Sequence, residues 1–146
     1  MKTITAGILT ALVIYSCSTK HPDAEINLEG TWKLLSSTLV QNNDTTLTDY
    51  TKDQSFIKVI NKHHFAFLSH IFQQTPDRFS AGGGTYLLQG KIYTEHLEYC
   101  SAPEWEGHDF TFEVSIHNDT LVQNGVEKIA SQNINRLTIE KYIKVP

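Results

Sequence analysis

The feature that most limits the fold of this chain is a period of two in its apolar residues. The stretch "DFTFEVSIH" at 109–117 places an apolar side chain at every second position, with polar side chains between them. Two adjacent apolar runs at 55–72 flank a polar turn, and the segments 30–40 and 135–145 alternate as well. Because successive side chains of a β-strand point to opposite faces, this pattern predicts strands with one buried face.

About eight such strands fit along the chain, separated by turn residues such as Asn118-Asp119, and no segment has a helical period over a useful length. The two long pieces expected to be irregular are 41–54 and 101–108. Short antiparallel strands that each have one apolar face favour a closed barrel or a sandwich. The sequence therefore predicts an all-β protein, with one domain after the N-terminal segment.

The N-terminal segment is distinct from the strands. Lys2 is followed by an apolar run from Ile4 to Tyr15, which is too short to span a bilayer because a spanning helix needs about 20 residues. The run ends in "IYSC" at 14–17, which resembles the lipobox of bacterial lipoproteins. That resemblance implies a signal peptide at 1–16, a lipidated N-terminus and tether at 17–27, and a barrel domain at 28–146. An ordinary secretory signal with an incidental cysteine is the alternative.

The lipobox resemblance also implies a location. Cys17 would become a multiply acylated N-terminus, carrying chains such as palmitate, and more than one chain usually gives stable anchoring. We expect anchoring in the outer membrane of the cell envelope. The tether begins Ser18-Thr19-Lys20-His21, without the acidic run that similar lipoproteins use for surface display. The periplasmic side is therefore expected rather than the cell surface.

Charge and cysteine content exclude several partners. The chain has 12 basic and 16 acidic side chains, a net charge of −4, and no basic run. This argues against nucleic acid and against electrostatic binding to membranes. With Cys17 committed to lipid, Cys100 has no partner for an intramolecular disulfide, so we expect it to be a small buried side chain.

A "GTW" at 30–32 opens the first strand and resembles the start of a lipocalin-type barrel. With "HFAF" at 64–67, "GGGTY" at 82–86, "YTEHLEY" at 93–99 and the closing "IEKYIK", the chain resembles the small lipocalin-like lipoproteins of Bacteroidetes. The resemblance implies an antiparallel up-and-down barrel that can hold a small molecule, and no established reaction. It also implies that Trp32 plugs one end, under a basic side chain supplied by Arg136, Lys141 or Lys144.

The segment 82–100 reads as a hairpin that turns at Gln89-Gly90 and carries a carboxylate on its apolar face. In that register Tyr86 faces Tyr93, and Gly84 faces Glu95 and leaves volume beside it. An ionised carboxylate is costly to bury without a partner, so Glu95 needs a donor, a bound water or a polar ligand. The candidate donors are Tyr86, Tyr93, Tyr99, His64 and Arg136.

Other patterns predict no metal site and no cofactor. His63 and His64 point to opposite faces of a strand, His96 and Glu98 lie on the polar face of theirs, and no HExxH or paired-cysteine motif occurs. The run Gly82-Gly83-Gly84 lacks the ending and the helix of a phosphate loop, so a bend or bulge explains it better. Trp105 lies in a loop between predicted strands. Three roles are open for its side chain: a cap on the barrel mouth, a contact with a partner, or simple packing.

Three functions remain open from the sequence. The first is a binding barrel for a small, mostly apolar molecule, without catalytic residues. The second is a structural or protein-interaction component of the envelope, with a barrel filled by its own side chains. The third is an enzyme that uses Glu95 as an acid or base, which would need a second titrating group in reach. The residues predicted to line the binding barrel are Phe65, Phe67, Tyr86, Tyr93, Glu95, Tyr99, Phe110 and Phe112.

Overall fold

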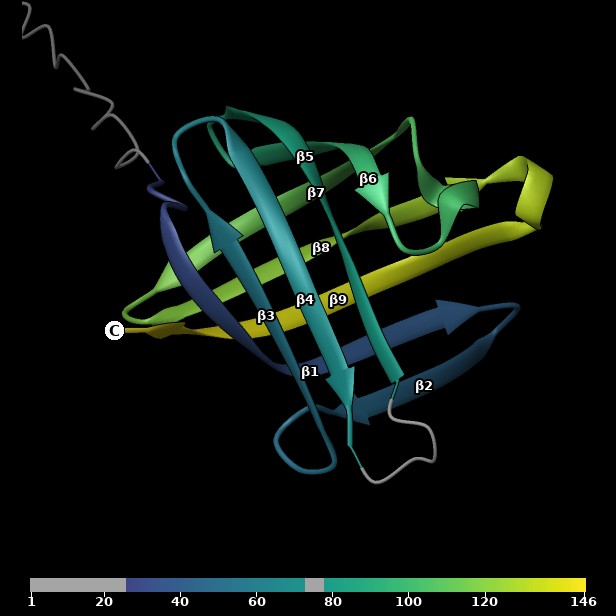
Figure 1. The fold of residues 1–146 in the computed structure, drawn as a ribbon, viewed down its shortest axis with the longest axis horizontal. Helices are drawn as coiled ribbons and strands as arrows, with labels where there is room; N and C mark the ends of the chain where they lie inside the picture. Colours follow the sequence, from purple (N-terminus) through teal and green to yellow (C-terminus); the bar gives the residue numbers. More distant parts are fainter. Residues whose placement is uncertain (1–25, 73–77) are drawn as a thin grey trace, which may run out of the picture.

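The computed structural model describes residues 26–72 and 78–146. The predicted signal peptide, Cys17 and the tether as far as residue 25 lie outside the described residues. The strands, shown in Figure 1, are β1 (Gly30–Gln41), β2 (Asp44–Asp49), β3 (Gln54–Ile60), β4 (His64–Ile71), β5 (Arg78–Gln89), β6 (Ile92–Cys100), β7 (His108–His117), β8 (Thr120–Ile129) and β9 (Ile134–Val145). No helix in the described part of the chain has the length and apolar character to cross a membrane.

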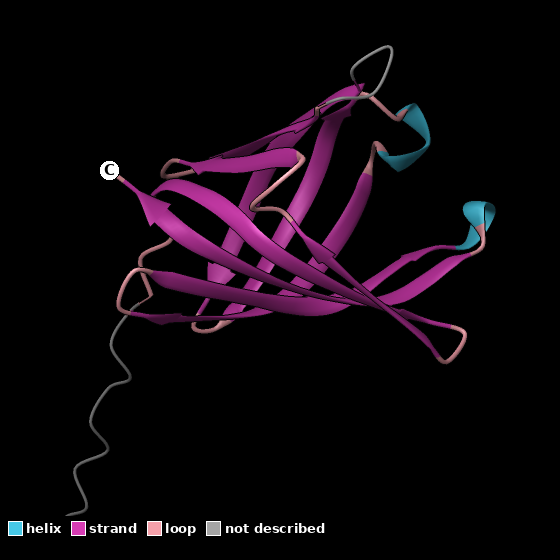
Figure 2. Cartoon of the chain, turned by 90° about the horizontal axis from the view of Figure 1, so that it is seen from below, coloured by secondary structure: helices cyan, strands magenta, loops and turns pink. Residues whose placement is uncertain are grey.

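The strands form one antiparallel sheet that closes on itself. Neighbours run in the order β1, β3, β4, β5, β6, β7, β8 and β9, and β9 pairs with β1 again. The predicted all-β barrel of about eight antiparallel strands is therefore confirmed. Two short 3-10 helices, η1 (Pro103–Trp105) and η2 (Ala130–Gln132), follow β6 and β8 and lie at the same end of the barrel (Figure 2).

Strand β2 is an addition that the sequence pattern did not reveal. It occupies part of 41–54, which was expected to be irregular, and pairs with the second half of β1 (Figure 1). Asn42 and Asn43 join the two strands with φ of 52° and 66°, a left-handed conformation that asparagine tolerates well. The side chains of β2 are mostly exposed, so no apolar alternation marks it as a strand.

Trp32 closes one end of the barrel, as the lipocalin-type start implies. Its side chain is 1% exposed, and its indole Nε1 donates a hydrogen bond to the Leu28 carbonyl at 2.8 Å. The Lys144 Nζ lies 5.3 Å from the centre of the indole, on the last strand. Of the three basic residues proposed for this place, Lys144 is the one found there, paired through β9 with β1.

The β5–β6 hairpin has the predicted faces over most of its length, although its register differs. Leu88 pairs with Tyr93 and Tyr86 with Glu95, a shift of two positions from the predicted register. A shift of two preserves which side chains share a face, so Tyr93 and Glu95 still point inward. Gly84 therefore lies opposite Leu97 rather than Glu95.

The prediction that Tyr99 lines the interior is wrong. A bulge between Gly83 and Gly84 places an extra residue on β6, so the alternation reverses and Tyr99 is 70% exposed. A Cβ atom on Gly84 would lie 2.0 Å from the His96 carbonyl oxygen, so only glycine fits at the bulge. The glycine run thus lies at a bulge, as the sequence predicted.

Replacing Trp32 by alanine should destabilise the protein by about 3–5 kcal/mol, because it empties the closed end of the barrel. Urea unfolding followed by tryptophan fluorescence and circular dichroism measures this loss. Tyr99→Ala is the matched control, since this aromatic side chain lies outside the barrel, and it should cost less than about 1 kcal/mol. A similarly small loss for Trp32→Ala would mean that the indole does not support the barrel.

Candidate functional site

A cavity of about 340 Å³ occupies the end of the barrel that carries η1 and η2. Strand directions define its place: β1 and β6 run from the closed end toward it, and β3 and β9 run from it toward the closed end. Its walls combine aromatic and aliphatic side chains with polar and charged ones. The apolar part includes Leu39, Phe56, Phe67, Leu97, Trp105, Phe110 and Phe112.

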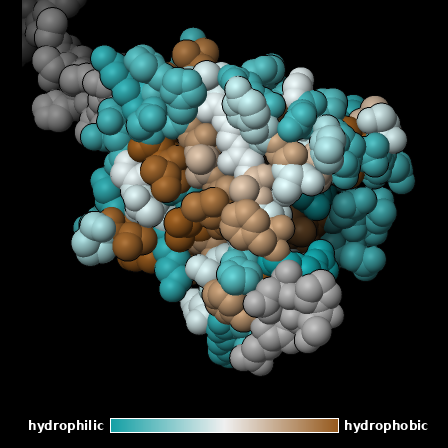
Figure 3. Space-filling model, viewed as in Figure 1, coloured by the Kyte–Doolittle hydropathy of each residue, from teal (hydrophilic) through white to brown (hydrophobic). Residues whose placement is uncertain are grey.

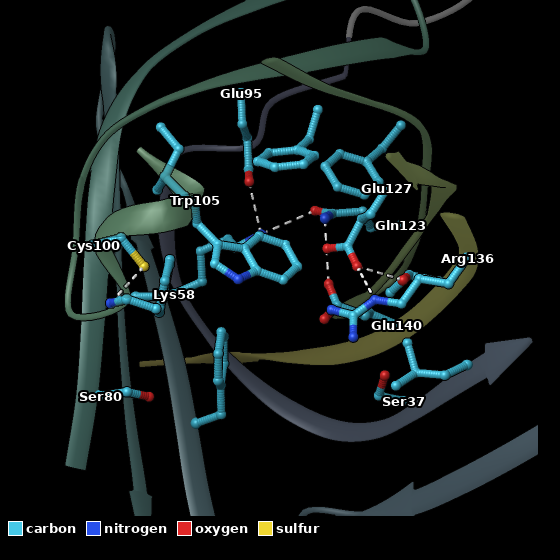
Figure 4. A pocket seen from close by; sticks show the side chains of 18 of the residues that line it. Ser37, Lys58, Ser80, Glu95, Cys100, Trp105, Gln123, Glu127, Arg136 and Glu140 are labelled. Atoms are coloured by element: carbon cyan, nitrogen blue, oxygen red, sulfur yellow. Dashed lines mark hydrogen bonds and ion pairs between the residues drawn. The ribbon is translucent and has the colours of Figure 1, made fainter. Parts of the chain in front are cut away.

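The deep side of the cavity holds a buried ion pair. The Lys58 Nζ on β3 donates to the Glu95 Oε1 on β6 at 2.7 Å, and the two side chains are only 4% and 9% exposed. The same ammonium donates to the Gln123 Oε1 on β8 at 3.2 Å. Figure 4 shows Lys58 reaching both partners across the barrel. These bonds join three strands that are distant in sequence.

Aromatic rings surround the Lys58 ammonium. The ring centres of Phe65 and Tyr93 each lie 5.9 Å from Nζ, and the ring centre of Tyr142 lies 5.4 Å away. The faces of aromatic rings attract cations, more strongly when water is excluded. Lys58 is therefore stabilised inside the barrel by Glu95, by Gln123 and by the electrostatics of the rings.

The polar network continues from Gln123 to Glu140 on β9. The Gln123 Nε2 donates to Glu140 Oε2 at 3.2 Å, and the Tyr142 hydroxyl donates to the same oxygen at 2.6 Å. Burial raises the pKa of Glu140, and the nearby carboxylates Glu127 and Glu95 raise it further, against the lowering effects of Lys58 and Tyr142. Burial and the Glu140 carboxylate also raise the pKa of the Tyr142 phenol.

A second ion pair lies toward the mouth of the cavity. The Arg136 Nε donates to Glu127 Oε2 at 2.6 Å, and the Thr138 hydroxyl donates to the same oxygen at 3.0 Å. The Arg136 guanidinium also lies 5.1 Å from the ring centre of Trp105. Trp105 itself lies 5.6 Å from the Phe110 ring, so it forms part of the cavity wall beside η1.

Strand β9 departs from the rule that the aliphatic face points inward. Its interior residues are Thr138, Glu140 and Tyr142, whereas Ile139 on the alternate face is 38% exposed. The register with β1, which places Leu34 opposite Tyr142, determines these faces. The face that a sequence pattern would mark as polar thus supplies much of the cavity floor.

The structure separates the residues predicted to line a binding site. Phe67, Glu95, Phe110 and Phe112 line the cavity. Three others do not belong to its lining: Phe65 and Tyr93 are buried toward the closed end, and Tyr86 donates its hydroxyl to the Asn61 carbonyl at 2.8 Å. Tyr99 lies outside, as described above. Ligand contact by any of these residues stays a prediction.

The inward orientation of Glu95 is confirmed, but its donor was not among the candidates. Lys58 takes that role, instead of Tyr86, Tyr93, Tyr99, His64 or Arg136. In "FIKVI" at 56–60 both faces of the strand are apolar apart from Lys58. The one sequence signal for its inward orientation was that it shares a strand face with Phe56 and Ile60. Gln123 and Glu140 were missed because neighbouring aliphatic residues obscure their faces.

The remaining polar groups do not form a metal centre. No three His, Cys, Asp or Glu side chains of the described residues gather closely enough to hold an ion. His96, on the outer face, lies 2.6 Å from Asp109, and Glu98 accepts a hydrogen bond from Thr85 at 2.8 Å. The buried Tyr93 hydroxyl has no hydrogen-bond partner among the described residues.

Comparison with known proteins supports the fold. No family model and no curated protein matches the chain. A lipocalin-like protein from Bacteroides uniformis superposes with a TM-score of 0.52 at 16% identity, covering 81% of this chain and 98% of that one. An uncharacterized protein from Bacteroides eggerthii gives 0.48 at 13% identity, over 82% and 100%. A variant of the fluorescent protein UnaG gives 0.39 at 11% identity, over 82% and 96%. The first similarity shows that the fold is lipocalin-like.

Removing either member of the buried ion pair should destabilise the protein strongly. Lys58→Met and Glu95→Gln should each cost about 3–5 kcal/mol, because each leaves one buried charge without its counter-charge. The double variant should lose much less than the sum of the two, and urea unfolding of all four proteins measures the coupling.

The exposed ion pair between Lys52 and Asp49, at 3.7 Å, is the matched control for that cycle. Lys52→Met and Asp49→Asn should show no measurable coupling, because solvent screens their interaction. Strictly additive losses at Lys58 and Glu95 would show that the two side chains do not stabilise each other.

Proposed function

We propose that this protein is a lipid-anchored envelope protein of the lipocalin-like kind, which binds one small, mostly apolar molecule inside its barrel. The observation that carries the proposal is the cavity of about 340 Å³ with aromatic walls and a polar floor. Binding pockets for small molecules are concave and mostly apolar, with a few polar groups that orient the ligand. Eight-stranded barrels are either filled by their own side chains or hold one small ligand, and this barrel has a packed closed end and a cavity at the other.

The ion pair of Glu95 favours an orienting role over an acid or base role. Its carboxylate is bound at 2.7 Å to the ammonium of Lys58, so its charge is already compensated. A general base must be free to take a proton from a substrate within reach. We therefore place Glu95 in the cavity floor as a fixed polar surface, and we do not propose a reaction.

We place the tether at the closed end of the barrel, because the described residues that precede β1 lie there. The described chain begins at Ile26, and Leu28 is buried against Trp32 at that end. A lipid on Cys17 would thus attach the closed end to the outer membrane, on the periplasmic side. The mouth of the cavity would then open away from the bilayer, where a small molecule can enter from water.

A second candidate function is docking of a partner on the outer face of the barrel. Val59, Leu68, Phe79 and Tyr99 are exposed on β3 to β6, and Figure 3 shows apolar side chains gathered on the face of β3 and β4. Exposed apolar patches often mark interaction surfaces. The cavity on the other side of the same strands favours the binding barrel.

Gentle purification from its own host followed by native mass spectrometry should reveal a bound small molecule. Ser80→Trp, at the cavity mouth, should displace this molecule, because the indole occupies the space that it needs. Phe79→Trp, the neighbouring residue on the outer face of β5, should retain it. The proposal is wrong if the wild type carries no added mass and binds no small apolar molecule in solution.

The anchor has its own test. Cys17→Ala should abolish incorporation of labelled fatty acid and release the protein from the membrane fraction, whereas Cys100→Ala should leave both unchanged. Protein that still incorporates label after Cys17→Ala would overturn the lipid anchor. Reaction of intact cells with an impermeant reagent should leave the barrel unlabelled, and labelling would place it at the cell surface.

A further inference from the structure

The charged side chains that line the cavity are unequal in number. Among the described residues, the acidic members are Glu95, Glu127 and Glu140, and the basic members are Lys58 and Arg136. Both basic side chains are committed to ion pairs, at 2.7 Å with Glu95 and at 2.6 Å with Glu127. Glu140 is therefore the carboxylate of this lining that has no cation of its own.

Glu140 also has an acceptor available to the cavity. Gln123 and Tyr142 both donate to its Oε2. The hydrogen bonds that Glu140 accepts from the described residues both end on Oε2, and the side chain lines the cavity, which leaves Oε1 without a donor from those residues. A carboxylate oxygen can accept two or more hydrogen bonds, so Oε1 is a place for a donor from outside the protein.

The surroundings of Glu140 favour a positive charge there. The charged and titratable groups that face it are Lys58 from β3, Glu95 and Tyr93 from β6, Glu127 from β8, Arg136 and Tyr142 from β9, and Tyr50 from the segment between β2 and β3. Burial and the neighbouring carboxylates raise the pKa of Glu140, as described above. An ionised Glu140 is thus costly until a cation compensates it.

The aromatic walls of the cavity also favour a bound cation. The rings of Phe56 and Phe67 stack with their centres 5.5 Å apart and 10° between their planes, which makes a flat wall. Trp105 and Phe110 form another aromatic part of the lining. The face of an aromatic ring attracts a cation, while an anion would meet the ring faces and three carboxylates. Neither basic residue is free to receive an anion.

We propose that the molecule bound in the cavity is a cationic amine on a small apolar or aromatic body, and that Glu140 is the residue that binds its ammonium group. This step rests on the proposed function, because it assigns the ligand class of the same cavity. Lys58 and Glu95 hold the floor, while Oε1 of Glu140 accepts the N–H bonds of the amine. The protein should therefore reject molecules of the same shape that carry a carboxylate.

Three naphthalene derivatives of nearly equal size test the proposal by isothermal titration calorimetry at pH 7.5. They are 1-naphthylmethylamine, which is cationic, 1-naphthalenemethanol, which is neutral, and 1-naphthoate, which is anionic. The amine should bind about tenfold more tightly than the alcohol, as expected for a hydrogen bond to a charged group. The naphthoate should bind most weakly of the three.

Glu140→Gln should remove the preference for the amine over the alcohol, because the amide keeps the size and the bonds to Gln123 and Tyr142 but loses the charge. Glu113→Gln, on the exposed face of β7, is the matched control and should keep the preference. Circular dichroism reports whether each variant is folded.

A pH series on the wild type gives a second measurement that needs no variant. The affinity for the amine should fall as the pH is lowered through the raised pKa of Glu140, because the carboxylate takes up a proton, and the affinity for the alcohol should stay constant. An amine affinity that does not change with pH, together with a Glu140→Gln variant that keeps the preference, would overturn the role of Glu140.

Two further outcomes separate this proposal from the proposed function. If the three naphthalenes bind equally, or if naphthoate binds best, the assignment of a cationic ligand is wrong and the binding barrel stands. If none of them binds and native mass spectrometry finds no molecule that Ser80→Trp displaces, both the ligand class and the binding function are wrong.

Discussion

The ion pair between Lys58 and Glu95 is the interaction on which the interior of this barrel depends. It joins β3 to β6 and, through Gln123, reaches β8, so one ammonium group connects strands from three parts of the chain. Two buried charges are costly unless each compensates the other and their remaining hydrogen bonds are made. Here the carboxylate, an amide oxygen and three aromatic rings together meet that requirement. The pair therefore holds its position only in the closed barrel.

This ion pair divides the interior into two parts with different contents. Toward the closed end, Trp32, Tyr93 and Leu121 are buried in the core and give the barrel its hydrophobic support. Toward the mouth, the side chains leave about 340 Å³, with the polar network as the floor. The packed core and the cavity proposed to bind a ligand thus lie at opposite ends of the same strands.

Strand alternation in the sequence predicts the orientation of Glu95 correctly but not that of Tyr99. The alternation in "YTEHLEY" predicts its inward orientation, and the observed register, shifted by two positions, leaves that orientation unchanged. Tyr99 lies beyond the bulge at Gly83 and Gly84, where one extra residue reverses the faces, and its predicted inward orientation is wrong. The partner Lys58 could not be identified, because strand alternation carries no information about which residue lies across a closed barrel.

The sequence by itself determined the fold class, since a period of two, turn residues and a tryptophan at the start of the first strand reflect local geometry and burial. It also determined that a carboxylate would face the interior. Tertiary structure alone decided the partner of that carboxylate, the polar inner face of β9 and the position of Glu140 in the cavity floor. These features arise where β1 pairs with β9 and closes the sheet, which brings together side chains whose separation in the sequence is unrelated to their distance in space.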